Sequence, residues 1–247
     1  MKLILVSSPI DYSPASIVSR RLSRTGVDTH TEVSIVKEAL AMGVEAFHLR
    51  KKSWGFEELQ NFLANFNENE LTKISIHGPL GWPIMLGLRR VHFKDNLKEI
   101  SDEEDKFTES IEEIRTTFDV VKISRSFHQI DDLRFDAHKY DLAFLSPIWN
   151  SISKEGYDTP FDLDKLKGQL SNMRIQHIKN DQSIDLYALG GIDEDKISQA
   201  QELGFDGVAV LGCVWQSNDP IKKIKTLLAE CTRVQKQSED DSGGLTQ

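Results

Sequence analysis

Eight short apolar runs, rich in β-branched or aromatic residues, recur along the 247-residue chain. They cover residues 2–6, 46–50, 73–77, 90–93, 119–124, 141–145, 184–189 and 207–212. Between them lie stretches with helical spacing, such as 31–43, whose apolar residues fall on one helical face. Strands that alternate with helices pair in parallel, and eight such units fit a closed barrel better than an open sheet. The sequence therefore predicts a single (β/α)8 TIM barrel.

The composition points to a small-molecule ligand. The chain has a formal net charge of −9, so we expect no nucleic acid and no membrane among its partners, although a local basic pocket can still hold a small anion. The first apolar run has only four residues before Ser7, too few for a secretory or membrane-spanning segment. We therefore expect a cytoplasmic protein. Cys213 and Cys231 do not suggest a disulfide scaffold.

The domain expectation is one barrel over residues 1–236. Residues 237–247 have no apolar face and are expected to form a disordered tail. Two polar segments, 11–31 and 94–107, fit the alternation poorly, and we interpret them as insertions.

In this fold the active site lies at the carboxyl ends of the strands. Along the second run and its continuation, "FHLRKKS", period-two alternation sends His48, Arg50 and Lys52 to one side. Arg50 and Lys52 are thus candidates for holding a phosphate or a carboxylate through charge-assisted bonds. The alternative is a solvated basic loop.

Glycines follow the last two runs, in "LGGID" and "VLGCVW". The loops after strands 7 and 8 commonly bind phosphate in this fold, because glycine lets backbone N–H groups approach an anion. The predicted phosphate-binding residues are Gly190, Gly191, Leu211 and Gly212. The alternative is a plain strand-to-helix turn with Asp193 as the helix N-cap.

Four histidines, His48, His77, His92 and His128, fall near the ends of strands 2 to 5, which could bring them together. Such imidazoles invite a zinc interpretation, but no close-spaced ligand pair and no carboxylate accompanies them. We therefore predict no metal site. A single histidine that acts as both acid and base is simpler, and His128 is the candidate. The alternative is a histidine that caps the following helix.

The sixth run is followed by "SPIWNSISKEG", residues 146–156, which carries hydroxyls and Lys154. This segment is either an ordinary polar loop or an anion-binding loop on the catalytic rim.

Six segments together resemble the thiamine phosphate synthase and thiazole tautomerase family over residues 2–230. They are "HLRKKS", "VHF", "SRSFH", "SPIWNSISK", "ALGGI" and "GVAVLG". The resemblance implies a TIM barrel that handles a thiazole phosphate. The synthase branch joins it to a magnesium-bound pyrimidine diphosphate with loss of pyrophosphate, and the tautomerase branch isomerises a thiazole carboxylate phosphate.

The resemblance also implies roles for single residues. Arg50, Lys52 and Lys154 match the family's diphosphate-binding positions, and Gly191 and Gly212 match its thiazole-phosphate cradle. The remaining predicted substrate-binding residues are the hydroxyls Ser126, Ser151 and Ser153.

The chain departs from the synthase pattern at the positions where the synthases hold their metal ion. His48 stands where the synthases have Gln, His77-Gly78 stands where they have Asn-Asp, and Asp95 is the only acidic residue near the end of strand 4. The resemblance therefore favours the tautomerase branch, with His128 as proton shuttle, Arg50 and Lys52 on the substrate carboxylate, and no cofactor.

Two alternatives remain open. One is a synthase that uses Mg²⁺, and the other is a barrel that senses thiamine-type phosphates without turnover. The oligomeric state is open as well, a homo-oligomer included.

Overall fold

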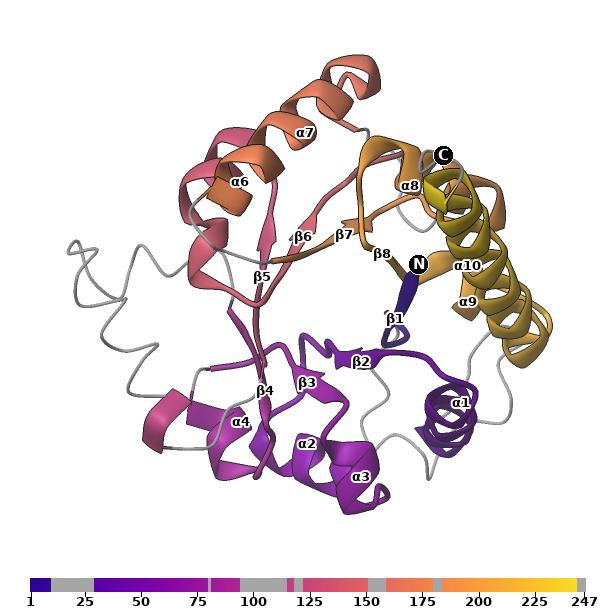
Figure 1. Ribbon diagram of the computed structural model, residues 1–247. Helices are drawn as coiled ribbons and strands as arrows, with labels where there is room; N and C mark the ends of the chain where they lie inside the picture. The colour runs from indigo at the N-terminus through magenta and orange to yellow at the C-terminus, as the bar shows by residue number, and fades with distance from the viewer. Residues whose placement is uncertain are drawn as a thin grey trace.

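The computed structural model describes residues 1–9, 29–79, 81–93, 115–117, 122–150, 159–179 and 184–243. Eight parallel strands pair in sequence order, and the last pairs with the first to close a barrel (Figure 1). They are β1 Lys2–Val6, β2 Ala46–Leu49, β3 Ile74–Ile76, β4 Arg90–Phe93, β5 Lys122–Phe127, β6 Leu142–Leu145, β7 Asp185–Leu189 and β8 Gly207–Val210. The predicted (β/α)8 architecture is confirmed.

Helices surround the barrel (Figure 1). They are α1 Thr29–Ala41, α2 Phe56–Leu63, α3 Glu68–Leu71, α4 Gly81–Met85, α6 Ile130–Asp136, α7 Leu163–Lys179, α8 Ile197–Leu203, α9 Gly212–Trp215 and α10 Pro220–Gly243, with the 3₁₀ turns η3 Ala137–Lys139 and η4 Glu194–Lys196. Within the described ranges, none of the helices has the length and apolar character needed to cross a membrane.

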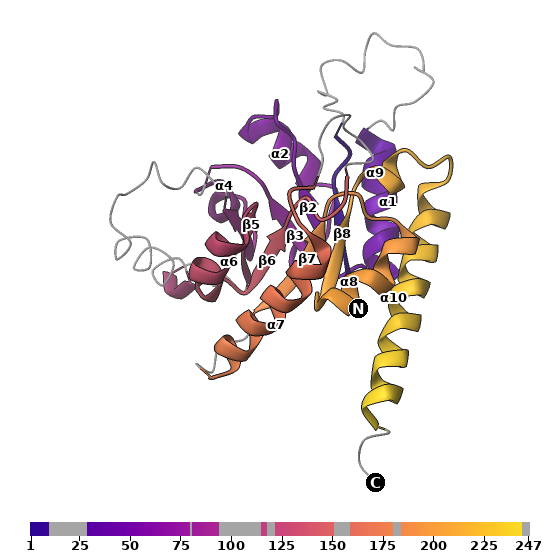
Figure 2. The ribbon, with the colours of Figure 1, turned by 90° about the horizontal axis from the view of Figure 1, so that it is seen from above.

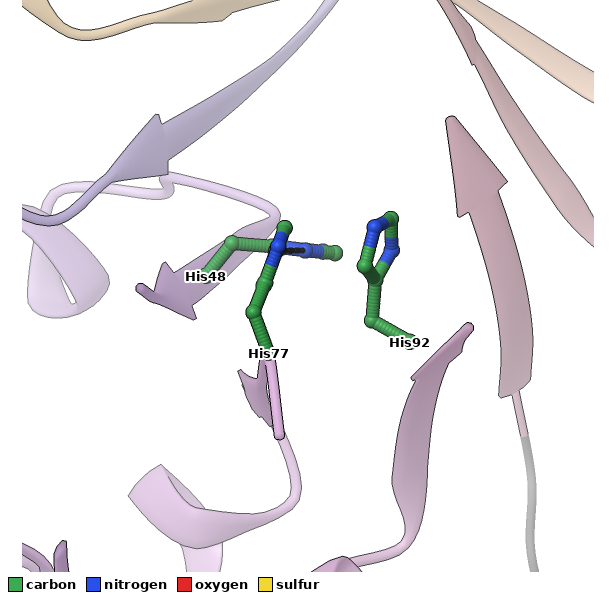
Figure 3. A group of neighbouring side chains, drawn as sticks. All are labelled: His48, His77 and His92. Atoms are coloured by element: carbon green, nitrogen blue, oxygen red, sulfur yellow. Dashed lines mark hydrogen bonds between the residues drawn. The ribbon is translucent and has the colours of Figure 1, made fainter. Parts of the chain in front are cut away.

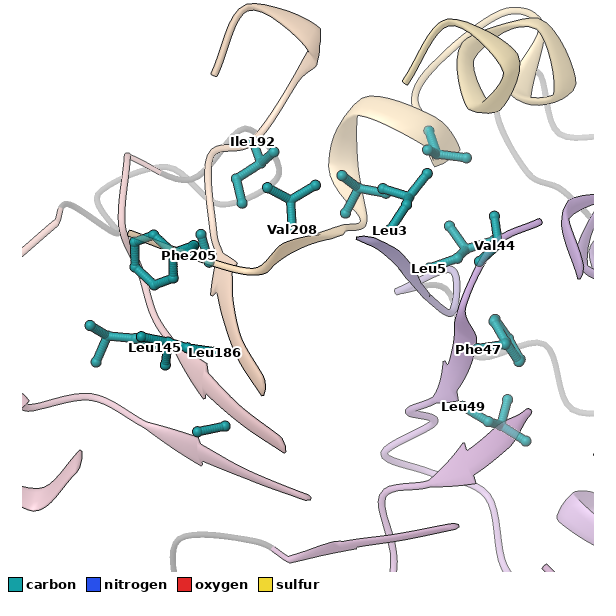
Figure 4. Close-up of a cluster of buried hydrophobic side chains, with 14 of the residues drawn as sticks. Leu3, Leu5, Val44, Phe47, Leu49, Leu145, Leu186, Ile192, Phe205 and Val208 are labelled. Carbon is teal, nitrogen blue, oxygen red and sulfur yellow. The ribbon is translucent and has the colours of Figure 1, made fainter. Parts of the chain in front are cut away.

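The pleat of the strands divides their side chains between two cores. In β1, Leu3 and Leu5 pack with the helices in the larger cluster, and Ile4 and Val6 belong to a smaller cluster inside the barrel. Figure 4 shows part of the larger cluster, which lies between the strands and the surrounding helices. The smaller cluster contains only seven buried apolar residues, so polar side chains occupy much of the remaining interior.

The fifth strand and the chain end differ from the prediction. Strand β5, Lys122–Phe127, ends three residues beyond the predicted range 119–124, whose first three residues lie outside the described residues. Inward-facing Ser124 and Ser126 break the apolar pattern by which the strand was located. The predicted disordered tail, 237–247, is wrong over residues 237–243, which continue α10. Figure 2 shows these last turns running past the end of the barrel.

Side-chain hydrogen bonds at helical spacing explain why α10 continues without an apolar face. Arg233 Nη1 donates to Gln237 Oε1 at 2.7 Å, and Gln235 Nε2 donates to Glu239 Oε1 at 3.2 Å. Pairs of this kind stabilise exposed helices. Residues 11–28 and 94–107 of the two predicted insertions lie outside the described residues, as do residues 244–247.

A buried ion pair fastens the ends of β1 and β2 to α1. Lys51 Nζ lies 2.7 Å from Glu32 Oε2, and the two side chains are 0% and 1% exposed. Glu32 Oε1 accepts a hydrogen bond from the Ser8 amide at 2.8 Å, and Lys51 Nζ donates to the Ser8 carbonyl at 2.9 Å. Each charge is therefore compensated by the other and by main-chain groups.

Replacing Lys51 should destabilise the fold. Lys51→Met leaves the Glu32 carboxylate buried without this cation, and we expect a loss of about 3–5 kcal/mol in the free energy of unfolding, measured by urea denaturation. The matched control is Lys37→Met, because Lys37 is 43% exposed and lies 3.8 Å from Glu70. That change should stay within about 1 kcal/mol. Equal losses in the two variants would contradict the assignment.

The loops after β6 and β7 pack directly on each other. The Ile148 amide donates to the Leu189 carbonyl at 3.0 Å, and the Trp149 amide donates to the Gly190 carbonyl at 3.2 Å. Gly191 has φ +67°, and a Cβ there would lie 2.7 Å from the carbonyl carbon of Trp149. Glycine is therefore needed at this position both for its backbone conformation and for the close approach of the neighbouring loop.

The loss of stability caused by a side chain at Gly191 can be separated into backbone strain and a clash with the neighbouring loop. Gly43 also has positive φ, at +106°, but a Cβ there meets nothing within 4 Å. Both Gly43→Ala and Gly191→Ala introduce backbone strain, and only the second also introduces the clash. We expect Gly191→Ala to lower the free energy of unfolding by about 1–3 kcal/mol more than Gly43→Ala. Equal losses of unfolding free energy in denaturant titrations of the two variants would contradict this, because they would show that the loop after β6 accommodates the added methyl group without strain.

Candidate active site

The two predicted cations lie at the mouth of the barrel. Arg50 and Lys52 follow β2 directly, and both are exposed. Neither side chain makes a hydrogen bond or an ion pair with the described part of the chain. Lys51 points the other way, to the buried Glu32. The alternation predicted for this segment thus gives two accessible positive charges beside the opening of the barrel.

His128 is the first residue after β5, and it is exposed. Its Nδ1 lies 2.8 Å from the Ser146 carbonyl oxygen and 3.3 Å from the Ser146 hydroxyl. A carbonyl can only accept, so Nδ1 carries the proton in this hydrogen bond, and the neutral ring has its lone pair on Nε2. Ser146 begins the loop after β6, so this contact joins two neighbouring loops of the rim.

Three of the four predicted histidines meet inside the barrel. His48, His77 and His92 come from the adjacent strands β2, β3 and β4, and their rings point toward one another (Figure 3). Each offers one nitrogen, and these three nitrogens lie within 4.8 Å of one another. His128 is not part of this group. We call His48, His77 and His92 the histidine cluster.

The rings of the cluster contact one another closely. His48 Nδ1 lies 3.1 Å from His77 Nε2, a hydrogen bond drawn as a dashed line in Figure 3. The rings of His77 and His92 stack, with centroids 3.8 Å apart and planes inclined by 22°. Phe144 packs edge-on against His48 at 4.9 Å. The cluster thus has an apolar wall on the β6 side.

Two serines of β5 orient His92. Ser124 Oγ donates to the Val91 carbonyl at 3.2 Å and lies 2.9 Å from His92 Nδ1. Because the Ser124 hydroxyl donates its proton to the Val91 carbonyl, its oxygen accepts a hydrogen bond from His92 Nδ1–H. The lone pair of the His92 ring is therefore on Nε2. Ser126 Oγ lies 3.3 Å from that Nε2. Ser126, predicted as a substrate-binding residue, therefore contacts the histidine cluster.

Burial governs the protonation of His48. His48 and His92 are 2% and 4% exposed. Burial, with smaller contributions from the charges of His92 and Arg90, holds the pKa of His48 well below its ordinary value. His48 is therefore a neutral imidazole at neutral pH.

The predicted phosphate-binding residues lie on the opposite side of the mouth. Gly190 and Gly191 follow β7, and both have positive φ. Leu211 and Gly212 follow β8, and Gly212 begins α9. Asp193 precedes η4, but its side chain makes no capping hydrogen bond. The glycine pair is required by the packing of the β6 loop, and this structural requirement accounts for both glycines without a ligand.

Three of the predicted residues lie outside the described residues. They are Ser151, Ser153 and Lys154, in the loop after β6, whose first part, through Asn150, is described. Their anion-binding role stays a prediction.

Sequence reasoning missed the residues that position the histidines. Ser146 holds His128 with a main-chain oxygen, and Ser124 orients His92 from the next strand. A signal for Ser124 was available, because His92 and Ser124 are register partners on β4 and β5. No side-chain pattern signals the Ser146 contact, since any residue can supply a carbonyl.

Comparison with known proteins gives a family and a fold. A family model described as thiamine monophosphate synthase matches residues 17–214. A Geobacter sulfurreducens protein, provisionally named a thiamine-phosphate synthase, is 29% identical over 89 residues. That alignment covers 36% of this chain and only 38% of the relative.

Two solved structures share the barrel over nearly its whole length. Thiamine phosphate pyrophosphorylase from Bacteroides thetaiotaomicron is 22% identical with a TM-score of 0.65, covering 94% of this chain and 98% of the other. The Pyrococcus furiosus thiamine phosphate pyrophosphorylase is 17% identical with a TM-score of 0.61, covering 94% and 96%. Because the family model spans well over half of the sequence, this chain belongs to the thiamine monophosphate synthase family.

Proposed function

We propose that this protein isomerises a thiazole carboxylate phosphate in thiamine biosynthesis, with His128 as the group that moves the proton. The observation that carries the proposal is the hydrogen bond from His128 Nδ1 to the Ser146 carbonyl at the mouth of the barrel. It presents Nε2 as the basic nitrogen of an exposed ring, which is the arrangement a general base requires.

The reaction is a 1,3-type proton shift that makes the thiazole ring aromatic. His128 Nε2 removes a proton from one ring position, and the resulting imidazolium returns it at the other, so the enzyme ends unchanged. The Ser146 carbonyl accepts from Nδ1–H throughout and stabilises the imidazolium. One histidine therefore supplies both acid and base.

The substrate has two anionic ends, and the mouth offers a separate partner for each. Arg50 and Lys52 are exposed beside β2 and are suited to the carboxylate through charge-assisted bonds. The glycine loops after β7 and β8 lie across the mouth and are suited to the phosphate. Lys154 and the hydroxyls of Ser151 and Ser153 are proposed as further contacts to the anion.

A second candidate is condensation of a thiazole phosphate with a pyrimidine diphosphate, favoured by the description of the matching family. This reaction uses Mg²⁺ in the synthase branch. The histidine cluster is the group of potential metal ligands found in the described residues, and it contains no carboxylate. Mg²⁺ prefers oxygen ligands, so this donor set does not fit it, and we derive no step through the ion.

The test is turnover of the carboxythiazole phosphate isomer by the wild type and by His128→Ala. Loss of the proton shuttle should lower kcat by about 10²–10⁴-fold. The matched control is His138→Ala, because His138 is also exposed but lies in η3, before β6 begins. Its kcat should be unchanged. Undiminished isomerisation by His128→Ala would remove His128 from the mechanism.

The same preparations separate the rival functions. With thiazole phosphate, pyrimidine diphosphate and Mg²⁺, the proposal predicts no thiamine phosphate. Magnesium-dependent product would establish the second candidate instead. Tight binding of thiamine-type phosphates with no turnover of either substrate would identify a sensor.

A further inference from the structure

We propose that the histidine cluster binds one divalent transition-metal ion of the zinc type inside the barrel. This proposal concerns a ligand set that the isomerisation mechanism does not use, and it stands or falls independently of that mechanism. It also reverses the prediction from sequence, which rejected a metal because no close-spaced ligand pair was visible. Adjacent parallel strands bring His48, His77 and His92 together without any such spacing.

The spacing of the nitrogens is close to that of a metal site. Zinc binds imidazole nitrogen at about 2.0–2.1 Å, so two nitrogens on one tetrahedral ion lie roughly 3.3 Å apart. His48 Nδ1 and His77 Nε2 are already 3.1 Å apart. The three ligand nitrogens lie within 4.8 Å of one another, and the widest pair must close by at most about 1.5 Å. Rotation of the stacked His77 and His92 rings supplies such a movement.

The hydrogen bonds of His92 suit a metal ligand. Zinc binds the lone pair of a neutral imidazole. The hydrogen bond from His92 Nδ1–H to Ser124 fixes the tautomer that directs a lone pair to Nε2. Metal-binding histidines typically donate their other ring N–H in this way, which orients the ring and raises its basicity. Ser124 is therefore a positioning residue for the proposed site.

The residues around the histidine cluster favour a bound ion that can be reached from the mouth of the barrel. Ser75, inward on β3 in register with His48, is 1% exposed, and its hydroxyl makes no hydrogen bond within the described structure. Buried hydroxyls normally make hydrogen bonds, so the Ser75 hydroxyl is available to bind a water molecule on the proposed metal ion. His77, the least buried of the three ligands, follows β3 toward the mouth.

Three imidazoles select the metal and leave one position for another ligand. Imidazole suits Zn²⁺, Co²⁺, Ni²⁺ and Fe²⁺, whereas Mg²⁺ and Ca²⁺ prefer oxygen. Sites with three protein ligands keep a fourth position for water or substrate. Because neutral imidazoles leave the ion's double positive charge uncompensated, the ligand expected there is an anionic oxygen of a small molecule that enters from the mouth.

The experiment is calorimetric titration of zinc chloride into the metal-free full chain, with any oligohistidine tag removed. We expect one zinc per chain, undisturbed by excess Mg²⁺. His77→Ala should weaken binding by at least about 100-fold, and Ser124→Ala, which keeps all three ligands, by about 10–100-fold. His138→Ala is the control for surface imidazoles and should bind as the wild type does. Cobalt should give a visible absorption spectrum that is lost in His77→Ala.

Circular dichroism establishes that each variant is folded before titration. The proposal is overturned if the wild type binds no stoichiometric zinc, or if folded His77→Ala binds it as tightly as the wild type. Unchanged affinity in Ser124→Ala would equally contradict the site, and this variant tests the proposal even if His77→Ala does not fold.

Discussion

The alternation of side chains along parallel strands is the constraint on which the rest of this structure depends. A residue on a barrel strand faces either the helices or the interior, and one step along the chain reverses the choice. The consequences are sharp at β2, where His48 enters the interior while neighbouring Phe47 packs outward with the helices. Directly after the strand, Arg50 reaches solvent, and the next residue, Lys51, contacts a buried carboxylate. A shift of register by one residue would bury a guanidinium and expose an ion pair.

The rim on the other side of the barrel is built by loops that hold one another. The loop after β6 bonds to the loop after β7 through main-chain groups, and its first residue holds His128 after β5. Glycine at 191 permits the first contact, and the Ser146 carbonyl makes the second. The proposed proton shuttle and the proposed phosphate loops are therefore positioned by the same segment, although neither is close to the other in the sequence.

Much of the fold, but less of the site, could be predicted from the sequence. Seven apolar runs located their strands to within a residue or two, because strand burial leaves a strong local pattern. The end of strand β5 was predicted too early, since its inward serines replace apolar residues, and so was the end of α10, since its last turns are stabilised by polar pairs. His128, Arg50 and Lys52 were placed at the mouth by topology alone. The histidine cluster was considered and then set aside, because the distance between neighbouring strands in space has no counterpart in sequence spacing.

The contact between His128 and Ser146 is made to a main-chain oxygen, and this has a consequence for how the site can vary. Substitution at position 146 removes the hydroxyl but keeps the carbonyl, so it does not change which ring nitrogen of His128 carries the proton. What the histidine depends on is the path of the backbone, which Pro147, Gly190 and Gly191 determine through their close packing. Related chains could thus differ at residue 146 and keep the same chemistry, or share it and lose that chemistry through a change in the neighbouring glycines.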